Sequence, residues 1–139
     1  MLRTTKKEVK EKIRAYILEN MDFTGYIGYD GYPDTEPKTD GEKVILCRDI
    51  FRYEYRYNIR GMGEYHAFRE WLCGVPSALT VELSYYGARH ILESWLEETE
   101  EESSRFDDSK MMDQFLHLVA REFFAMVDKA EREKAKKGV

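Results

Sequence analysis

The chain has 139 residues and a mass of 16.5 kDa, which predicts a single domain over residues 1–139. Its 42% hydrophobic and 35% charged residues exclude the disordered and fibrous classes. No apolar run approaches the roughly 18–20 residues of a membrane span, so no membrane contact is expected. The formal net charge of -5 argues against a dedicated nucleic-acid-binding domain, which is usually basic.

The charge is distributed unevenly along the chain. Residues 1–14 carry six basic and two acidic side chains, and residues 128–139 carry five basic and three acidic ones. Residues 93–108 hold eight acidic side chains against one arginine. The chain therefore has two basic ends and an acidic belt, residues 93–108, which the net charge does not reveal.

The first predicted element is a helix that ends near Asn20. Thr5 and Glu8 have the spacing of a capping box, in which each side chain bonds the backbone of the other. Val9 and Ile13 then follow at helical spacing and indicate one apolar face.

Residues 21–41 are predicted to form a long loop with a Gly-Tyr repeat. Tyr26, Tyr29 and Tyr32 each follow a glycine, and two prolines exclude a helix there. A loop of this length is either functional or held on the surface by its own side chains. The three tyrosines are therefore candidate residues for binding a protein partner or unstacked bases. The alternative is that their rings clamp the loop over the core.

The segment from Thr39 towards Arg60 shows two competing periods. Thr39 and Glu42 predict a second capping box, whereas aromatic residues alternate with polar ones from Phe51 onwards, as in a half-buried strand. We favour one helix because no turn residue interrupts the segment. The alternative is an α+β fold with a small sheet formed by residues 50–60 and 78–84.

Four arginines recur every four residues in the same segment. On one helix they would form a slowly winding basic stripe, interleaved with tyrosines, that suits a partner or a phosphate backbone. The alternative is intramolecular pairing with the acidic belt or with nearer carboxylates. The candidate residues are Arg48, Arg52, Arg56 and Arg60.

The rest of the chain predicts three more helices. Residues 61–63 should break the chain before a short helix that ends at Gly74, and Ser77 should cap a segment that reaches about Thr99. Asp107 or Asp108 should cap the last helix, and residues 129–139 are predicted to be a frayed basic tail. The prediction is thus an all-α protein, with about five helices in a compact bundle and one long Gly/Tyr-rich loop.

Motifs of catalysis and metal binding are missing from the sequence. Neither a Glu-x-x-His motif nor a G-x-S-x-G elbow occurs, so we expect no catalytic, cofactor-binding or metal-binding residues. Cys47 and Cys73 lie in apolar runs, which predicts reduced, packed thiols. Because the N-terminus also lacks a signal-like apolar region, the expected location is the cytoplasm.

The run Trp71-Leu72-Cys73-Gly74-Val75-Pro76-Ser77 resembles a W-L-x-G-(L/V)-P-S signature. That signature occurs in a family of short bacterial proteins without a known activity, often encoded in mobile or conjugative genetic regions. The likeness extends over roughly residues 5–128, although the family more often has glutamine where this chain has Cys73. The resemblance implies a small helical cytoplasmic protein with an accessory role in a mobile element, and no catalytic residue carries over.

From the sequence we expect a non-catalytic protein-interaction or accessory module with a protein partner. The second hypothesis is a nucleic-acid-associated accessory protein that uses the arginine–tyrosine face and the basic N-terminal helix. An enzyme whose site is invisible in the sequence is the third hypothesis. The sequence also leaves a homo-oligomer open.

Overall fold

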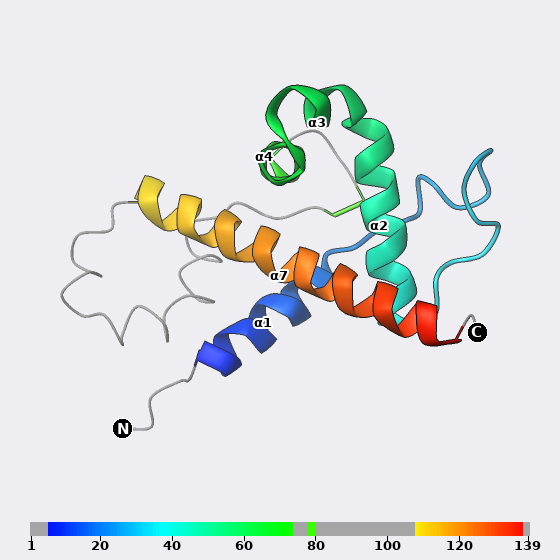
Figure 1. Cartoon of the computed structure of the whole chain (residues 1–139), viewed down its shortest axis with the longest axis horizontal. Helices are drawn as coiled ribbons and strands as arrows, with labels where there is room; N and C mark the ends of the chain where they lie inside the picture. The colour runs from blue at the N-terminus through cyan, green and yellow to red at the C-terminus, as the bar shows by residue number, and fades with distance from the viewer. Residues whose placement is uncertain (1–5, 74–77, 80–107, 138–139) are drawn as a thin grey trace.

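The computed structural model describes residues 6–73, 78–79 and 108–137, and within these ranges all regular structure is helical (Figure 1). The prediction of an all-α protein is therefore confirmed for the described residues. The helices are α1 (Lys6–Glu19), α2 (Asp40–Glu54), α3 (Arg56–Met62), α4 (Glu64–Leu72) and α7 (Asp108–Lys137).

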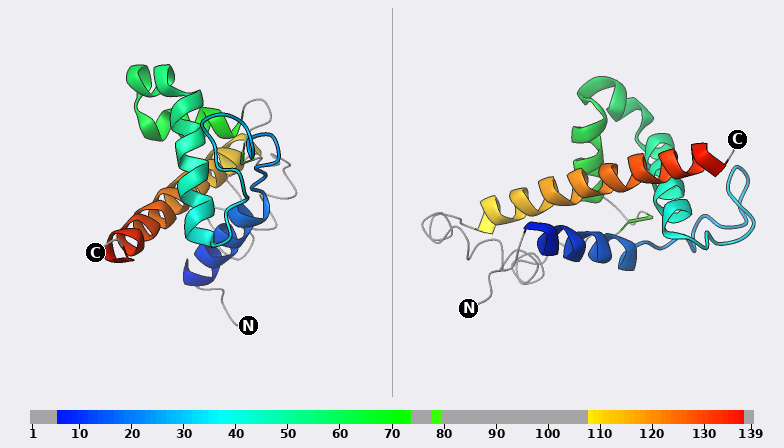
Figure 2. Two further views of the ribbon diagram at one scale, coloured as in Figure 1. Left: turned by 90° about the vertical axis from the view of Figure 1, so that its right-hand side faces the viewer. Right: turned by 60° about the horizontal axis from the view of Figure 1, so that its bottom comes forward.

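The longest helix, α7, is the element against which the others pack. It contacts α1, α2 and α4, while α3 packs on α2 and α4 at the far end of α2 (Figures 1 and 2). The buried face of α7 carries apolar residues at helical spacing, among them Phe115, Val119 and Phe123. This stripe explains why so long a helix is stable: it is covered along most of its length.

Aromatic rings form the centre of the core. Phe68 of α4 stacks on Phe123 of α7, with ring centroids 4.5 Å apart, and also contacts Phe51 of α2 edge-on at 5.1 Å. Trp71 lies against both Phe51 and Phe68. Aromatic pairs at these separations add to the stabilisation that comes from burying their area.

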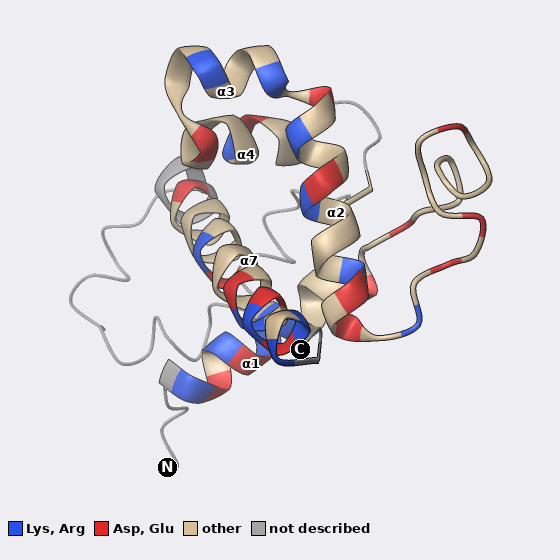
Figure 3. Ribbon diagram, turned by 45° about the vertical axis from the view of Figure 1, so that its right-hand side comes forward, with Lys and Arg blue, Asp and Glu red and all other residues tan. Residues whose placement is uncertain are grey.

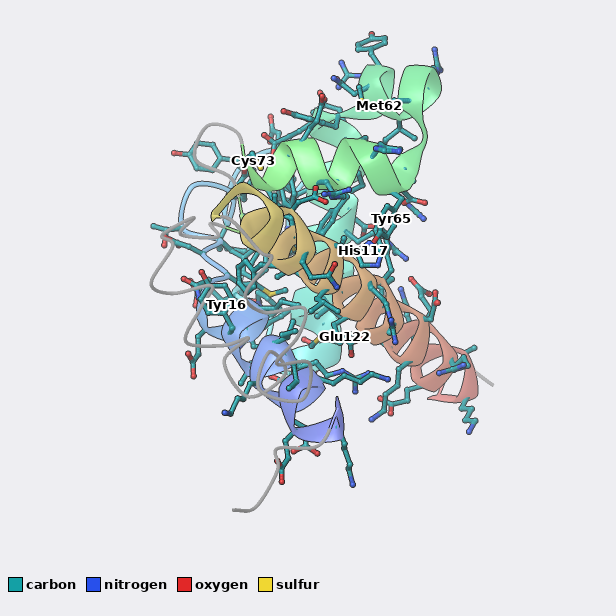
Figure 4. The ribbon with its side chains drawn as sticks, turned by 90° about the vertical axis from the view of Figure 1, so that its left-hand side faces the viewer. Tyr16, Met62, Tyr65, Cys73, His117 and Glu122 are labelled. Carbon is teal, nitrogen blue, oxygen red and sulfur yellow. The ribbon has the colours of Figure 1, made fainter. Side chains whose placement is uncertain are left out.

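Among the residues that the structure describes, one charged side chain is buried with this core. Glu122 of α7 is 2% exposed and accepts a hydrogen bond from Arg14 Nε of α1 at 3.1 Å. Figure 4 shows Glu122 on α7 where α1 packs beside it. A buried carboxylate is tolerated only when it is paired, so this contact fixes how α1 and α7 pack.

The start of α2 confirms the cap that the sequence predicts. Thr39 Oγ1 accepts a hydrogen bond from the Glu42 backbone N–H at 3.1 Å. The Glu42 carboxylate accepts from the Lys38 backbone N–H at 3.2 Å, one residue before the expected Thr39 N–H. The first bond satisfies a backbone donor in the first turn of α2, and the second satisfies a donor just before the helix and anchors the end of the loop.

Residues 50–60 are helical, so the alternative in which they form a strand is wrong. From Cys47 onwards, inward side chains recur every four residues rather than every two: Cys47 and Phe51 are fully buried, and Tyr55 and Ile59 are partly buried against the same core. The single helix predicted over this segment is also wrong, because Tyr55 (φ -110°, ψ 24°) separates α2 from α3. The change of direction places α3 over α4 (Figure 1).

Gly63 forms the second break. It has φ +91°, a conformation that side chains rarely adopt, and it both ends α3 and precedes α4. The predicted break over residues 61–63 is thus confined to Gly63, since Gly61 and Met62 are still helical. Helix α4 ends at Leu72, close to the predicted end.

The last helix is longer than the sequence predicts. Instead of fraying after Lys129, α7 continues to Lys137. Ala130 is buried with its Cβ 3.5 Å from the position that a Cβ on Gly41 would occupy, and Glu131 pairs with Arg48 of α2 at 2.7 Å. Packing against α2 therefore extends the helix beyond the point where the apolar pattern stops.

Several predictions lie outside the described residues. They are the capping role of Thr5, the helix from Ser77 to about Thr99, the acidic belt at 93–108 and most of the segment 78–84. Leu79 forms one isolated antiparallel bridge with Met21, and the Asp22 N–H donates to the Ala78 carbonyl at 2.9 Å.

Candidate functional site

The large hydrophobic side chains that are exposed on the described part of the chain come from two stretches of sequence. They belong to the loop between α1 and α2 and to the α2–α3 corner. We call them the tyrosine surface: Tyr29 (64% exposed), Tyr53 (62%), Tyr57 (68%) and Met62 (40%). Figure 4 shows Met62 at the outer end of α3, away from α7. Because exposed aromatic residues are enriched at protein interfaces, this surface is a candidate binding site.

An open groove of about 660 Å³ lies between the loop and α2. The loop supplies Asp30, Gly31, Tyr32 and Pro33, and α2 supplies Leu46, Asp49 and Tyr53. Tyr53 thus belongs to both the groove and the tyrosine surface, and Tyr29 directly precedes the loop residues that line the groove. The groove joins the loop and the helix into one site.

Two of the three loop tyrosines hold the loop in place. Tyr26 Oη donates to Glu54 Oε1 at 2.9 Å, and its ring meets Tyr32 edge-on with centroids 5.4 Å apart. Burial raises the pKa of Tyr26, as does the bond to Glu54, so its phenol stays protonated as the donor. Burial also raises the pKa of Tyr32. These two rings pack against the core, which is the clamping alternative, whereas Tyr29 is free to meet a partner.

Arg48 is held by carboxylates from two helices. Its Nη2 lies 2.7 Å from Glu131 Oε1 of α7 and 3.0 Å from Asp49 Oδ1, and only 11% of its side chain is exposed. Burial alone would lower the pKa of Arg48, but the hydrogen bonds to Glu131 and Asp49 raise it. Arg48 is therefore a structural residue, and its charge is neutralised within the protein.

The other three arginines of the predicted stripe have three different environments. Arg52 pairs with Glu64 of α4 at 2.7 Å. Arg56 lies over the rings of Tyr53 and Tyr57, at 4.6 and 4.8 Å from their centroids, and donates to the Tyr53 carbonyl. Arg60 forms no ion pair with any residue that the structure describes. The stripe is thus divided between two helices, and half of it is paired internally.

The loop beside the groove is acidic. Between residues 21 and 38 it holds four carboxylates and one lysine, and Figure 3 shows the acidic positions spaced along it. Asp22 is engaged locally, because it accepts hydrogen bonds from Thr24 that lower its pKa. Asp30, Asp34 and Glu36 pair with no basic side chain among the described residues. Every charged residue that lines the groove is acidic.

The described histidines lie in two places: His66 lines an open groove with Glu70 and Cys73, and His117 lies on α7. His117 lies beside Tyr65 (Figure 4): Tyr65 Oη is 2.7 Å from His117 Nδ1 and donates to the His117 carbonyl at 3.0 Å. Within the described ranges, no three His, Cys, Asp or Glu side chains are placed to hold a metal ion. His90 lies outside those ranges.

The two cysteines are both free, but only one is packed as predicted. Cys47 is fully buried on the inner face of α2, and burial raises its pKa. Cys73 is exposed at the end of α4, so the prediction that it is packed is wrong. Its apolar sequence neighbours Trp71 and Leu72 are buried, and the helical rotation from them turns Cys73 outwards.

Sequence reasoning found part of this site. The Gly-Tyr repeat points to Tyr29, and the four-residue series points to the four arginines, between which Tyr53 and Tyr57 lie. Sequence reasoning missed the groove because Leu46 and Asp49 meet the loop only through the tertiary fold. The spacing of Leu46, Asp49 and Tyr53, at three and four residues, was the available signal for one helix face.

Comparison of the chain with known protein families, with curated proteins and with solved structures gives no match. The resemblance of residues 71–77 to a family signature therefore stays a prediction, and residues 74–77 lie outside the described ranges. Among the described helices, none has both the length and the apolar character that a membrane span requires.

Proposed function

We propose that this chain is a non-catalytic interaction module that binds a protein partner through the tyrosine surface and the adjoining groove. The observation that carries the proposal is that Tyr29, Tyr53 and Tyr57 are each more than half exposed, while Tyr53 lines one groove with the loop that carries Tyr29 and shares the Arg56 guanidinium with Tyr57. Tyrosines supply large contact areas at low conformational cost, which makes them frequent anchors of interfaces.

Packing in the hydrophobic core does not account for these three rings. The same segments contain Phe51, Tyr26 and Tyr32, which do pack on the core, so the aromatic residues needed for the fold are already in place. Exposed rings add nothing to burial in the free protein and gain it only on contact with another molecule.

The proposal is tested by capture of partners from a native lysate with and without nuclease. We expect a discrete partner that is retained after nuclease treatment and lost in a Tyr29→Ser/Tyr53→Ser/Tyr57→Ser variant. The matched control is Lys10→Ser/Glu11→Ser/Lys129→Ser, which changes exposed residues of α1 and α7. An unchanged partner set in the tyrosine variant would contradict the proposal.

Binding of nucleic acid is the second candidate, and it rests on Arg56 and Arg60. Neither forms an ion pair with the described residues, and Arg56 lies over the exposed rings of Tyr53 and Tyr57, on which bases could stack. If this candidate holds, nuclease releases the captured material and affinity falls steeply with added salt. An affinity that does not change with salt concentration would exclude nucleic-acid binding.

The setting of the module belongs to the same proposal. A cytoplasmic location is supported by the two free cysteines, because exposed thiols persist most readily in a reducing compartment. The accessory role in a mobile genetic element is supported by the family resemblance alone.

A further inference from the structure

The groove between the loop and α2 has a charge and a shape that favour one class of side chain. Among the described residues that line it, the charged ones are Asp30 and Asp49, both acidic, and the same loop carries Asp34 and Glu36. Asp49 shares Arg48 with Glu131, so one positive charge faces two negative ones there. The guanidinium of Arg56 over Tyr53 is one further positive charge, and the carboxylates of Asp30, Asp34 and Glu36 outnumber it, so the region keeps a negative excess that would attract a cation and repel a phosphate.

The uncharged lining suits the rest of a long basic side chain. Leu46 and Pro33 offer apolar surface to a methylene stem, and the aromatic side chains of Tyr32 and Tyr53 line the same groove. Tyr53 already contacts one cation within the protein, because the Arg56 guanidinium lies 4.6 Å from its ring centroid, so an incoming cation would meet the part of that ring that Arg56 leaves open.

We infer that the groove binds an arginine or lysine side chain presented by an extended segment of the protein partner. The inference rests on the proposed function and adds to it the chemistry that the partner must carry. The aromatic contacts of the tyrosine surface would supply contact area around this charged anchor, and the carboxylates would supply selectivity for a basic residue.

The test uses three N-acetylated, C-amidated pentapeptides, Ala-Leu-X-Leu-Ala, with arginine, citrulline or glutamate at X. Amide NMR shifts of Gly31, Leu46 and Asp49 report binding at the groove. We expect saturable shifts with the arginine peptide, affinity at least about tenfold weaker for the uncharged citrulline peptide, and no binding of the glutamate peptide.

Two loop variants form a matched pair. Asp30→Asn removes a carboxylate that lines the groove, whereas Asp34→Asn removes one from the same loop that does not line it. Both residues are exposed and neither pairs with a described basic side chain, so both variants should fold. We expect Asp30→Asn to lower the affinity for the arginine peptide about fivefold, and Asp34→Asn to lower that affinity by less than about twofold.

Three results would overturn the inference: equal binding of the arginine and citrulline peptides, equal effects of the two loop variants, or no saturable shift of the groove amides with the arginine peptide. These outcomes differ from a failure of the proposed function. If the tyrosine variant loses its partner while the peptides are not discriminated, the interaction surface stands and only the basic anchor is wrong. If the arginine peptide binds the groove while the tyrosine variant keeps its partners, the tyrosine surface is wrong.

Discussion

The inner and outer faces of the α2–α3 segment carry the same type of residue in opposite environments. Phe51 is fully buried against Phe68 and Trp71, whereas Tyr53, two positions later, is 62% exposed. The inner face is explained by core packing, and the outer face is not. The difference separates the aromatic content that folds the chain from the part that we assign to binding.

The largest effect on stability is expected from the inner face. Phe51→Ala would leave a cavity among three aromatic rings and should lower the free energy of unfolding by about 3–5 kcal/mol. Urea unfolding followed by circular dichroism measures it. A loss below about 1 kcal/mol would show that the inner face is not the core described above.

The two cysteines provide a chemical form of the same comparison. Cys47 lies on the inner face with a raised pKa, and Cys73 is exposed, although partial burial raises its pKa as well. Both thiols are mostly protonated at neutral pH, so accessibility decides between them. Iodoacetamide should modify Cys73 at least about 100-fold faster than Cys47, which must wait for local unfolding. Mass spectrometry of tryptic peptides gives both rates, and comparable rates would contradict the buried position of Cys47.

An intermediate effect is expected at the start of α2, the helix that carries both faces. Thr39→Ala removes the acceptor for the Glu42 N–H and should cost about 1 kcal/mol in the free energy of unfolding. Thr39→Ser keeps the hydroxyl and serves as the control. If both variants lose the same stability, the cap bond is not the cause.

The smallest effect on stability is expected from the outer face. Tyr53→Ser and Tyr57→Ser should each change the free energy of unfolding by less than about 0.5 kcal/mol, since their rings are mostly in water. If the Tyr53→Ser/Tyr57→Ser double variant loses as much free energy of unfolding as Phe51→Ala, the outer rings are structural and the contrast between the two faces is wrong.

The predictable parts of the fold are those that depend on local signals. The start of α2 was predictable from Thr39, because a helix cap depends on residues only three apart in sequence. The end of α4 lies within two residues of Gly74, where the sequence predicts it. The alternation of aromatic and polar residues after Phe51 suggested a strand, although the segment is helical. Phe51, Tyr55 and Ile59 are four residues apart, so they fit the inward face of a helix and also one face of a strand. The break at Tyr55 has no local signal and arises where α3 packs over α4.

The candidate site was predictable only in its residue types. Tyr26, Tyr29 and Tyr32 occupy equivalent places in the Gly-Tyr repeat, yet only Tyr29 is exposed, because the contact of Tyr26 with Glu54 joins residues 28 positions apart. Likewise, Arg48 looks like Arg60 in sequence, and the unexpected extension of α7 brings Glu131 to Arg48. Long-range packing decides which members of each repeat remain available.

The most direct test of the central claim is photo-crosslinking from a benzoylphenylalanine placed at position 53, compared with the same residue at exposed position 11 of α1. Our account predicts that position 53 gives a discrete adduct with a second protein in intact cells and that position 11 does not. Equal adduct patterns from the two positions, or no adduct from position 53, would contradict a binding role for the tyrosine surface.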